Sequence, residues 1–441
     1  MYTYARKHKP RKTIDMNKTN VLYIGGDGRA HAIVWKLLQS PQAGNIYASP
    51  GNPGIALSGG QNIPFPSMSK KPYEALAELA VELDVGLVVI GSEDHLSAGA
   101  ADVFSNRGLK TFGPKGGAWV VESSKAYAKL LMEEAEIPTA PFGITSSPGI
   151  AGELSRARGG KAVIKADGLA QGKGVFVCRN MDEAETAIKI LMIDKKFGEA
   201  GSKVIVEDLL DGNEFSLQIL TDGFNYRMLP AVKDYKRRDN NDEGLMTGGM
   251  GAIGPIAVDP ILMKQIEETI IVPFLKTMES RNMPFSGCLY VGLMITKDGP
   301  KVLEFNARFG DPEAQVLMTL LHDRVDLIEV FLSCLNGRLG NIDLIWKDLY
   351  CSCITLAAQG YPETPRLGDK IHIISDESRD HIRLFHAGTI WKDGNLVTNG
   401  GRVLSLTTLF KDSDDRSIPY YEISYGQVRF NDMQYREDIG V

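Results

Sequence analysis

A glycine-rich loop between two apolar runs is the feature that most constrains what this chain can fold into. The stretch Lys165–Val175, KADGLAQGKGV, contains three glycines and two lysines, and residues 162–164 and 175–178 predict a strand on either side. Glycine lets the backbone approach a ligand closely, and successive N–H groups beside lysines suit a phosphate. The strand–loop–strand setting excludes a Walker loop and a GxGxxG fingerprint, because both open a helix. A surface hairpin without a ligand is the alternative that the glycine content leaves open.

Length and charge limit the class of protein. A chain of 441 residues predicts two to four domains. The net charge of −6 gives no bulk attraction to nucleic acid or to an anionic membrane, so local basic groups must meet any anionic ligand. No apolar run approaches the roughly 20 residues that span a bilayer. Five cysteines without a CxxC pair favour reduced, buried thiols and a cytoplasmic protein.

The N-terminal third predicts a doubly wound parallel sheet. Residues 1–19 are basic and lack an apolar segment, so we expect a disordered extension, with an organelle transit peptide as the less favoured alternative. Strands alternate with helices over residues 20–123, which is typical of a parallel sheet with helices on both faces. Ligands bind such sheets at the carboxyl ends of the strands. Gly25–Arg29, Gly51–Gly54 and Glu93 follow strand ends and are expected to share one cleft.

Two further regions follow. Residues 124–345 mix helices with antiparallel hairpins and include a small lid at about 142–209. Residues 346–441 contain many short β-like runs separated by turn signals, which predicts a β-rich C-terminal domain.

The stretch VLEFNARFGDPE predicts a metal site. Glu304 and Asn306 are two residues apart at a strand end, so their side chains point the same way. A carboxylate and an amide oxygen suit Mg²⁺, which completes its shell with water and phosphate oxygens. Arg308 lies on the same side and could bind a phosphate or acyl-phosphate oxygen bidentately. The alternative for Glu304 alone is a solvated residue at a sheet edge.

Glu207 and Glu214 flank a strand-to-turn segment after the lid. Such a segment can offer backbone groups to an adenine edge and a carboxylate to ribose hydroxyls. Two solvated acids at a turn are the equally open alternative.

Motifs from all parts of the chain together carry a family resemblance. In order they are Lys125, KADGLAQGKGV, VEDLLDGNEFS, TGGMGAIGP, CLYVGLM, LEFNARFGDPE, FHAGT and VTNGGRVL. Over about residues 20–440 the chain resembles the phosphoribosylamine–glycine ligases of the ATP-grasp superfamily. The resemblance implies an α/β protein, α+β in its central part, with an ATP-grasp fold between the doubly wound and the β-rich domains.

The resemblance also implies the reaction and its residues. Glycine would attack the γ-phosphate of ATP to give glycyl phosphate, and the amine of 5-phosphoribosylamine would then displace phosphate. Arg308 and Lys165 would act in catalysis, and Glu304 and Asn306 would hold Mg²⁺ or Mn²⁺. The implied ATP-binding residues are Lys125, Lys165, Gly168, Gly172, Lys173, Gly174, Glu207, Leu209 and Glu214. The implied substrate-binding residues are Gly25, Gly28, Arg29, Glu93, Asp234, Lys236, Gly248, Gly249, Asp311 and Arg402.

Three expectations accompany this assignment. The protein should act as a monomer. The hairpin Gly168–Gly174 should be mobile without nucleotide, because it has little apolar anchoring. Lys165 should be an exposed loop side chain, so Lys165→Met should weaken ATP use without disturbing the fold.

The chain departs from the family pattern mainly on the substrate side. Asp27 and Ala30 alter the first loop, Ser92 and His95 the acid strand end, Lys233 and Tyr235 the central loop, and Leu245 and Met246 the glycine-rich loop. Asp27 would repel a substrate phosphate unless it caps the helix that begins near Gly28. A divergent ligase for another acid or amine is therefore the alternative function, and a non-catalytic nucleotide-binding relative is a third.

Overall fold

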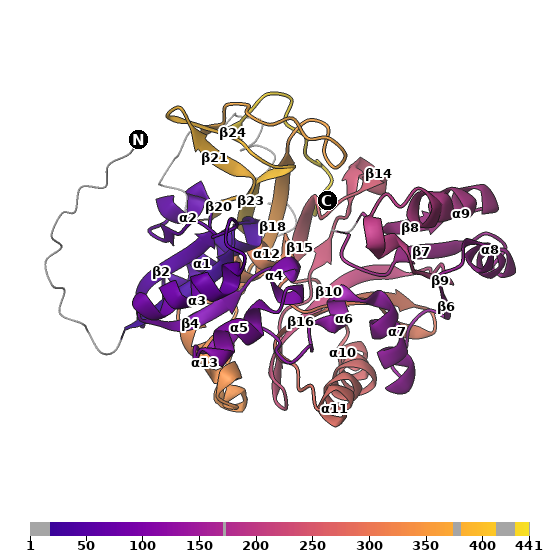
Figure 1. Ribbon diagram of the computed structural model, residues 1–441, viewed down its shortest axis with the longest axis horizontal. Helices are drawn as coiled ribbons and strands as arrows, with labels where there is room; N and C mark the ends of the chain where they lie inside the picture. The colour runs from indigo at the N-terminus through magenta and orange to yellow at the C-terminus, as the bar shows by residue number, and fades with distance from the viewer. Residues whose placement is uncertain (1–17, 171–172, 374–380, 412–427, 441) are drawn as a thin grey trace, which may run out of the picture.

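The N-terminal part is a parallel sheet with helices on both faces, as predicted (Figure 1). The computed structural model describes residues 18–170, 173–373, 381–411 and 428–440. The strand order is β3-β2-β1-β4-β5, with β1 (Thr19–Gly25), β2 (Ala43–Pro50), β3 (Gln61–Asn62), β4 (Val85–Ile90) and β5 (Thr111–Phe112). The helices are α1 (Gly28–Leu37), α2 (Pro53–Leu57), α3 (Pro72–Glu82), α4 (Glu93–Ser97) and α5 (Ala100–Asn106). Residues 1–17 of the expected extension 1–19 lie outside the described residues. Thr19, the last residue of that range, is the first residue of β1.

The lid is a four-stranded antiparallel sheet with two helices and an apolar core of its own. Its strand order is β6-β9-β7-β8, with β6 (Phe142–Thr145), β7 (Ala162–Ala166), β8 (Val175–Cys178) and β9 (Val204–Asp208). Its helices are α8 (Pro148–Ala157) and α9 (Met181–Ile188). The glycine-lysine loop therefore joins two paired strands, β7 and β8. Two short helices, α6 (Val120–Ser123) and α7 (Lys125–Glu134), connect the N-terminal sheet to the lid.

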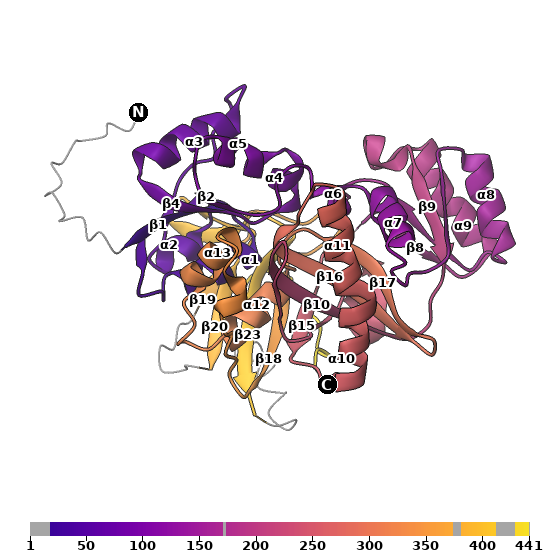
Figure 2. The same ribbon diagram turned by 90° about the horizontal axis from the view of Figure 1, so that it is seen from below.

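The central sheet is built from antiparallel hairpins, as predicted for this part of the chain. Its order is β11-β10-β16-β17, with β10 (Asn213–Asp222), β11 (Tyr226–Met228), β16 (Ser286–Thr296) and β17 (Gly299–Asn306). All neighbouring strands are antiparallel. The helices α10 (Pro260–Ile266) and α11 (Val272–Ser280) flank this sheet (Figure 2).

The C-terminal strands share a sheet with the central part. The order β12-β15-β18-β23-β20 combines β12 (Lys233–Asp234) and β15 (Gly251–Gly254) with β18 (Tyr350–Ala357), β20 (Ile382–His386) and β23 (Arg402–Phe410). Shorter pairs are β13 (Arg237–Asp239) with β14 (Glu243–Met246), β19 (His372–Ile373) with β24 (Val428–Arg429), and β21 (Thr389–Lys392) with β22 (Asn395–Thr398). The hydrogen-bonded sheet thus extends across residue 346, where we expected the C-terminal domain to begin. That domain boundary stays a prediction.

One helix fills the centre of the molecule. All eight residues of α12 (Glu313–Leu320) are buried, between α1 on one side and strands β15, β18 and β23 on the other. The helix α13 (Leu327–Leu335) follows it and packs on β10 and β16. The first residue of α12 and the turn before it consequently face the region where the N-terminal, central and C-terminal parts meet. None of the helices in the described ranges is long and apolar enough to cross a bilayer.

We predict that the side chain of Asn52 stabilises the contact between the N-terminal and C-terminal parts. Its Oδ1 accepts from Ile55 N at 3.0 Å and caps α2, while its Nδ2 donates to His386 O at 2.8 Å and Gly26 O at 3.0 Å. Asn52→Ala should lower the free energy of unfolding by about 2–4 kcal/mol, because a cap and two buried carbonyl partners are lost. Ser147→Ala, which removes a cap in the lid only, should cost about 1 kcal/mol. Urea denaturation of both variants would measure the difference, and equal losses would contradict this prediction.

Candidate active site

A cleft of about 550 Å³ lies where the lid, the central sheet and the N-terminal sheet meet. Its walls come from loops and strand ends of every part of the chain, from Asp27 to Arg402. The expected site residues that line it are Arg29, Glu93, Lys125, Lys165, Lys173, Gly174, Glu207, Leu209, Glu214, Asp234, Lys236, Gly248, Glu304, Asn306, Arg308, Asp311 and Arg402. Groups separated by more than 300 residues in the sequence are thus gathered in one space.

Four expected glycines do not line the cleft: Gly25, Gly28, Gly168 and Gly249. Gly28 begins α1, where a Cβ would lie 2.6 Å from Gln315 Nε2 of α12, so this glycine permits close helix packing. Gly249 has φ +116°, and a Cβ there would lie 2.5 Å from Pro312. These positions shape the loops rather than contact the space. Gly172 lies outside the described residues, so the expected mobility of the hairpin stays a prediction.

Lys165 is not the exposed loop side chain that we expected. It belongs to β7, where it pairs with Val175 and Ile205, and its side chain is 7% exposed. Its Nζ contacts Glu207 Oε1 and donates to Leu303 O at 3.0 Å. The apolar run 162–164 simply continues two residues further as a strand. Lys165→Met would therefore also remove a partner of a buried carboxylate, which costs stability.

The sequence alone did not point to Lys129, which completes the ion pair. Lys129 lies four residues after Lys125 on α7, and its Nζ contacts Glu207 Oε2. Glu207 is 3% exposed, so it is neither a solvated acid nor free of partners. Burial lowers the pKa of Lys129 to about 8, against the opposing effect of Glu207. The i, i+4 spacing of two lysines on one helix was the available signal.

The proposed metal pair lies at the end of β17, beside Lys236. Burial would raise the pKa of Glu304, but Lys236, Lys125 and Lys165 lower it to about 2, so its carboxylate stays ionised. Lys236 Nζ donates to Glu214 Oε1 at 2.6 Å and lies 3.7 Å from Glu304 Oε1. The donor set is hard oxygen, as Mg²⁺ prefers. In the part of the chain that the structure describes, no three acidic, His or Cys side chains form a metal-binding group. An ion would therefore depend on water and phosphate oxygens for its remaining ligands.

Arg308 is held by two carboxylates from different parts of the chain. Its Nε donates to Glu93 Oε2 at 3.1 Å, and its NH2 lies 2.8 Å from Glu122 Oε1. Glu122 Oε2 also accepts from Ala307 N at 2.7 Å. Glu122 is a further residue that sequence reasoning missed, because nothing in VVESS marks it as different from a surface acid on a short helix.

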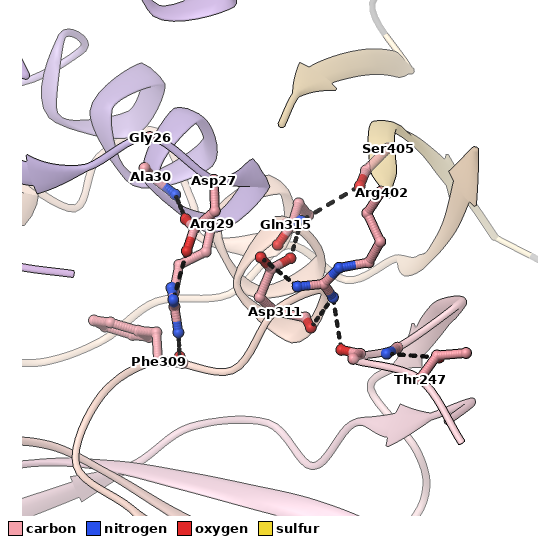
Figure 3. Close-up of polar contacts among 12 residues, drawn as sticks. Gly26, Asp27, Arg29, Ala30, Thr247, Phe309, Asp311, Gln315, Arg402 and Ser405 are labelled. Carbon is pink, nitrogen blue, oxygen red and sulfur yellow. Dashed lines mark hydrogen bonds and ion pairs between the residues drawn. The ribbon is translucent and has the colours of Figure 1, made fainter. Parts of the chain in front are cut away.

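Asp27 caps α1, which decides between the two roles left open for it. Its Oδ1 accepts from Ala30 N at 2.8 Å, and its Oδ2 pairs with Arg29 NH2 at 2.5 Å (Figure 3). Arg29 in turn donates to Phe309 O at 2.7 Å. The charge of Asp27 is therefore offset within its own helical turn, although the residue still lines the cleft.

Arg402 connects three loops on the side of the cleft opposite Asp27. It donates to Gly248 O and Asp311 O at 2.6 Å each and pairs with Asp311 Oδ2 at 3.0 Å (Figure 3). Gln315 donates to the other oxygen, Asp311 Oδ1, at 2.7 Å. Burial would raise the pKa of Asp311, but Arg402 and Arg29 lower it, so the carboxylate remains charged.

Comparison with known families matches nearly the whole chain. Three models of phosphoribosylglycinamide synthetase match it: the N domain over residues 19–122, the ATP-grasp (A) domain over 123–314 and the C domain over 351–441. The chain belongs to the phosphoribosylglycinamide synthetase family. This confirms the resemblance in the sequence and the expected α/β, ATP-grasp fold.

Relatives within the family differ in length. The chain is 40% identical to a phosphoribosylamine–glycine ligase of Caldanaerobacter subterraneus, with 95% of this chain and 99% of the relative covered. It is 41% identical to a trifunctional purine biosynthetic protein of Gallus gallus, but there it spans 42% of the relative, and it spans 54% of a bifunctional purine biosynthetic protein of Pichia angusta. The synthetase family therefore includes both ligases of this length and longer multifunctional proteins.

Solved structures agree with the synthetase fold. A crystal structure of phosphoribosylamine–glycine ligase from Thermotoga maritima matches with a TM-score of 0.81 and 32% identity, covering 96% of this chain and all of that one. A biotin carboxylase from Campylobacter jejuni matches with a TM-score of 0.70 at 15% identity, which shows the fold alone.

We predict that the cap, not the charge, is what Asp27 contributes to stability. Asp27→Asn keeps an acceptor for Ala30 N and should change the free energy of unfolding by less than about 1 kcal/mol. Asp27→Ala loses the cap and should cost about 1–2 kcal/mol. Urea denaturation of both variants measures this. If Asn is as destabilising as Ala, the ion pair with Arg29 is the larger contribution.

We predict that Glu93 contributes to acid denaturation. Burial would raise its pKa, but Arg308 and Arg29 lower it to about 2. A folded pKa below the unfolded value means that ionised Glu93 stabilises the fold above about pH 4.5, and this contribution of up to about 3 kcal/mol is lost as pH falls toward 2. Stability measured from pH 6 to pH 2.5 should therefore fall less steeply for Glu93→Gln than for wild type. Parallel curves would contradict this account.

Proposed function

We propose that the protein joins glycine to 5-phosphoribosylamine at the expense of ATP. The glycine carboxylate attacks the γ-phosphorus of ATP, so an acyl phosphate forms and ADP leaves. The amine of phosphoribosylamine then attacks the acyl carbon, inorganic phosphate leaves, and glycinamide ribonucleotide remains. The longer relatives carry further activities, and the proposal concerns this reaction alone.

One observation carries the proposal: three groups suited to phosphoryl transfer border one cleft. Lys125, Lys165 and Lys173 lie on the lid side, Glu304 and Asn306 at the end of β17, and Arg308 just beyond them. Cations on the lid suit the phosphates of ATP, and the guanidinium suits the acyl phosphate.

The residues promote the reaction by position and charge. Phosphoryl transfer needs aligned reactants and stabilised negative charge rather than a protein nucleophile. All five cysteines are buried and free, and burial raises the pKa of Cys288, Cys351 and Cys353. Arg308, fixed by Glu93 and Glu122, can bind a forming acyl phosphate without reorganising. Glu304 and Asn306 would hold Mg²⁺ or Mn²⁺, which would neutralise charge on the phosphates.

Other assigned roles belong to this proposal. Glu207, the Leu209 backbone and Glu214 would bind the nucleoside of ATP, while Arg29, Glu93, Lys236 and Arg402 would bind the substrates. We also propose a monomeric enzyme in the cytoplasm, and the five unpaired thiols support the reducing compartment.

A different acid or amine substrate is the alternative. It is favoured by two acids that border the substrate end of the cleft, Asp27 and Asp94. Arg29 pairs with Asp27 and offsets its charge, which weakens the case for another substrate at Asp27 but not at Asp94.

The proposal predicts that ADP release requires all reactants together. Purified protein with ATP, Mg²⁺, glycine and freshly generated phosphoribosylamine should release ADP and form glycinamide ribonucleotide. Omitting glycine should reduce ADP release at least about tenfold, because no acyl phosphate can form. Omitting Mg²⁺ should have an effect of the same size, because the negative charge on the phosphates is then not neutralised. ADP release without glycine dependence, or faster release with another acid, would contradict the proposal.

A further inference from the structure

Two buried lysines share one carboxylate on the lid side of the cleft. Glu207 contacts Lys165 through Oε1 and Lys129 through Oε2, and the three side chains are 3–7% exposed. Burial would raise the pKa of Glu207, but Lys165 and Lys129 lower it, so the carboxylate stays charged. The three residues therefore form a buried cluster with two positive charges and one negative charge.

Only one of the two lysines faces the cleft. Lys165 and Glu207 border it, whereas Lys129 lies behind them and lines a small separate cavity of about 20 Å³. A pair made of Lys165 and Glu207 alone would be neutral and would offer an anion in the cleft no net charge. Because Lys129 takes one oxygen of the carboxylate, the surplus positive charge of the cluster lies at Lys165.

A second contact fixes Lys129 in place. Its Nζ donates to Thr139 Oγ1 at 2.6 Å, and Thr139 Oγ1 donates to Val302 O at 2.7 Å. Thr139 belongs to the connection between α7 and the lid, and Val302 to β17. A purely structural role would account for this hydrogen bond. It would not account for a second buried ammonium on a carboxylate that already has a cationic partner, because burying an extra charge is costly.

We propose that Lys129 is a positioning residue that gives Lys165 a net positive charge toward the phosphates of ATP. The inference rests on the proposed function, in which Lys165 binds those phosphates, and it adds a residue that does not touch the nucleotide. Glu207 holds the Lys165 ammonium in place, and Lys129 offsets the charge that Glu207 would otherwise cancel. The attraction for phosphate is strong because charges in a buried site are poorly screened.

The test measures the Kd of ATP and of adenosine, which has no phosphates. Lys129→Met removes the charge and keeps much of the side-chain volume. It should raise the Kd of ATP at least about tenfold, because the cluster becomes neutral. The Kd of adenosine should change less than about threefold. Lys129→Arg keeps the charge and should bind ATP at least about threefold more tightly than Lys129→Met.

Thr139→Val is the matched control. It removes the hydrogen bond to Lys129 but keeps the charge of the lysine and the shape of residue 139. The melting temperature should fall, because buried polar groups lose a partner, while the Kd of ATP stays within about threefold of wild type. If Thr139→Val weakens ATP binding as much as Lys129→Met does, the hydrogen bond rather than the charge is responsible and the inference is overturned.

The pH dependence of ATP binding is a readout that a structural role would not change. Burial lowers the pKa of Lys129 to about 8 against the opposing effect of Glu207, and Lys165 lowers it further. The protonated form binds ATP more tightly, so the wild-type Kd should rise between pH 7 and pH 9. This rise should be smaller in Lys129→Arg, because a guanidinium keeps its proton. The other charged side chains lining the small cavity are the same in both proteins: Lys125, Glu122 and Glu304.

The outcomes separate the inference from the function on which it rests. Wild-type protein that binds no ATP overturns both. ATP binding without glycine-dependent ADP release overturns the proposed reaction alone. An unchanged Kd of ATP in Lys129→Met, or equal losses for ATP and adenosine, overturns the inference alone. Should Lys129→Met fail to fold, identical pH profiles of wild type and Lys129→Arg would also overturn it.

Discussion

The two ion pairs of Arg308 are the interaction on which the site depends. Glu93 comes from the N-terminal sheet, Glu122 from the connection to the lid, and Arg308 from the end of the central sheet. One guanidinium thus fixes three segments relative to each other, next to the proposed metal pair. Both carboxylates also restrict the rotamers of Arg308, so its guanidinium is oriented before any substrate binds. A charge that is oriented in advance stabilises a transition state most effectively.

Local patterns were sufficient for the elements and for much of the cleft. The apolar runs beside KADGLAQGKGV predicted β7 and β8. The order of motifs along the chain predicted the family. Several helices were not anticipated, among them α8 and α13, although Ser147 before Pro148 and Asp326 before an apolar run are capping signals.

Pairings between distant residues could not be read from the sequence. Glu122 and Lys129 look like ordinary helix residues until the fold sets them beside Arg308 and Glu207, 186 and 78 positions further along the chain. The burial of Lys165 could not be predicted either, because a lysine at the start of a glycine-rich stretch is expected to be exposed in a loop. Glu313 shows the reverse case: its motif was recognised, but only the three-dimensional surroundings reveal that its carboxylate is buried without a partner among the described residues. Chain topology, rather than residue type, decides these environments.

The sheet that joins β12 and β15 to β18, β23 and β20 has a consequence for how the gene can be rearranged. Strands from residues 233–254 form one edge of a layer whose remainder lies after residue 349. A cut in the intervening chain would leave each half with unpaired strands, so neither half could be exchanged or inherited as an independent module. In the bifunctional and trifunctional relatives the aligned region is 54% and 42% of their length, and it takes in 96% and 95% of this chain.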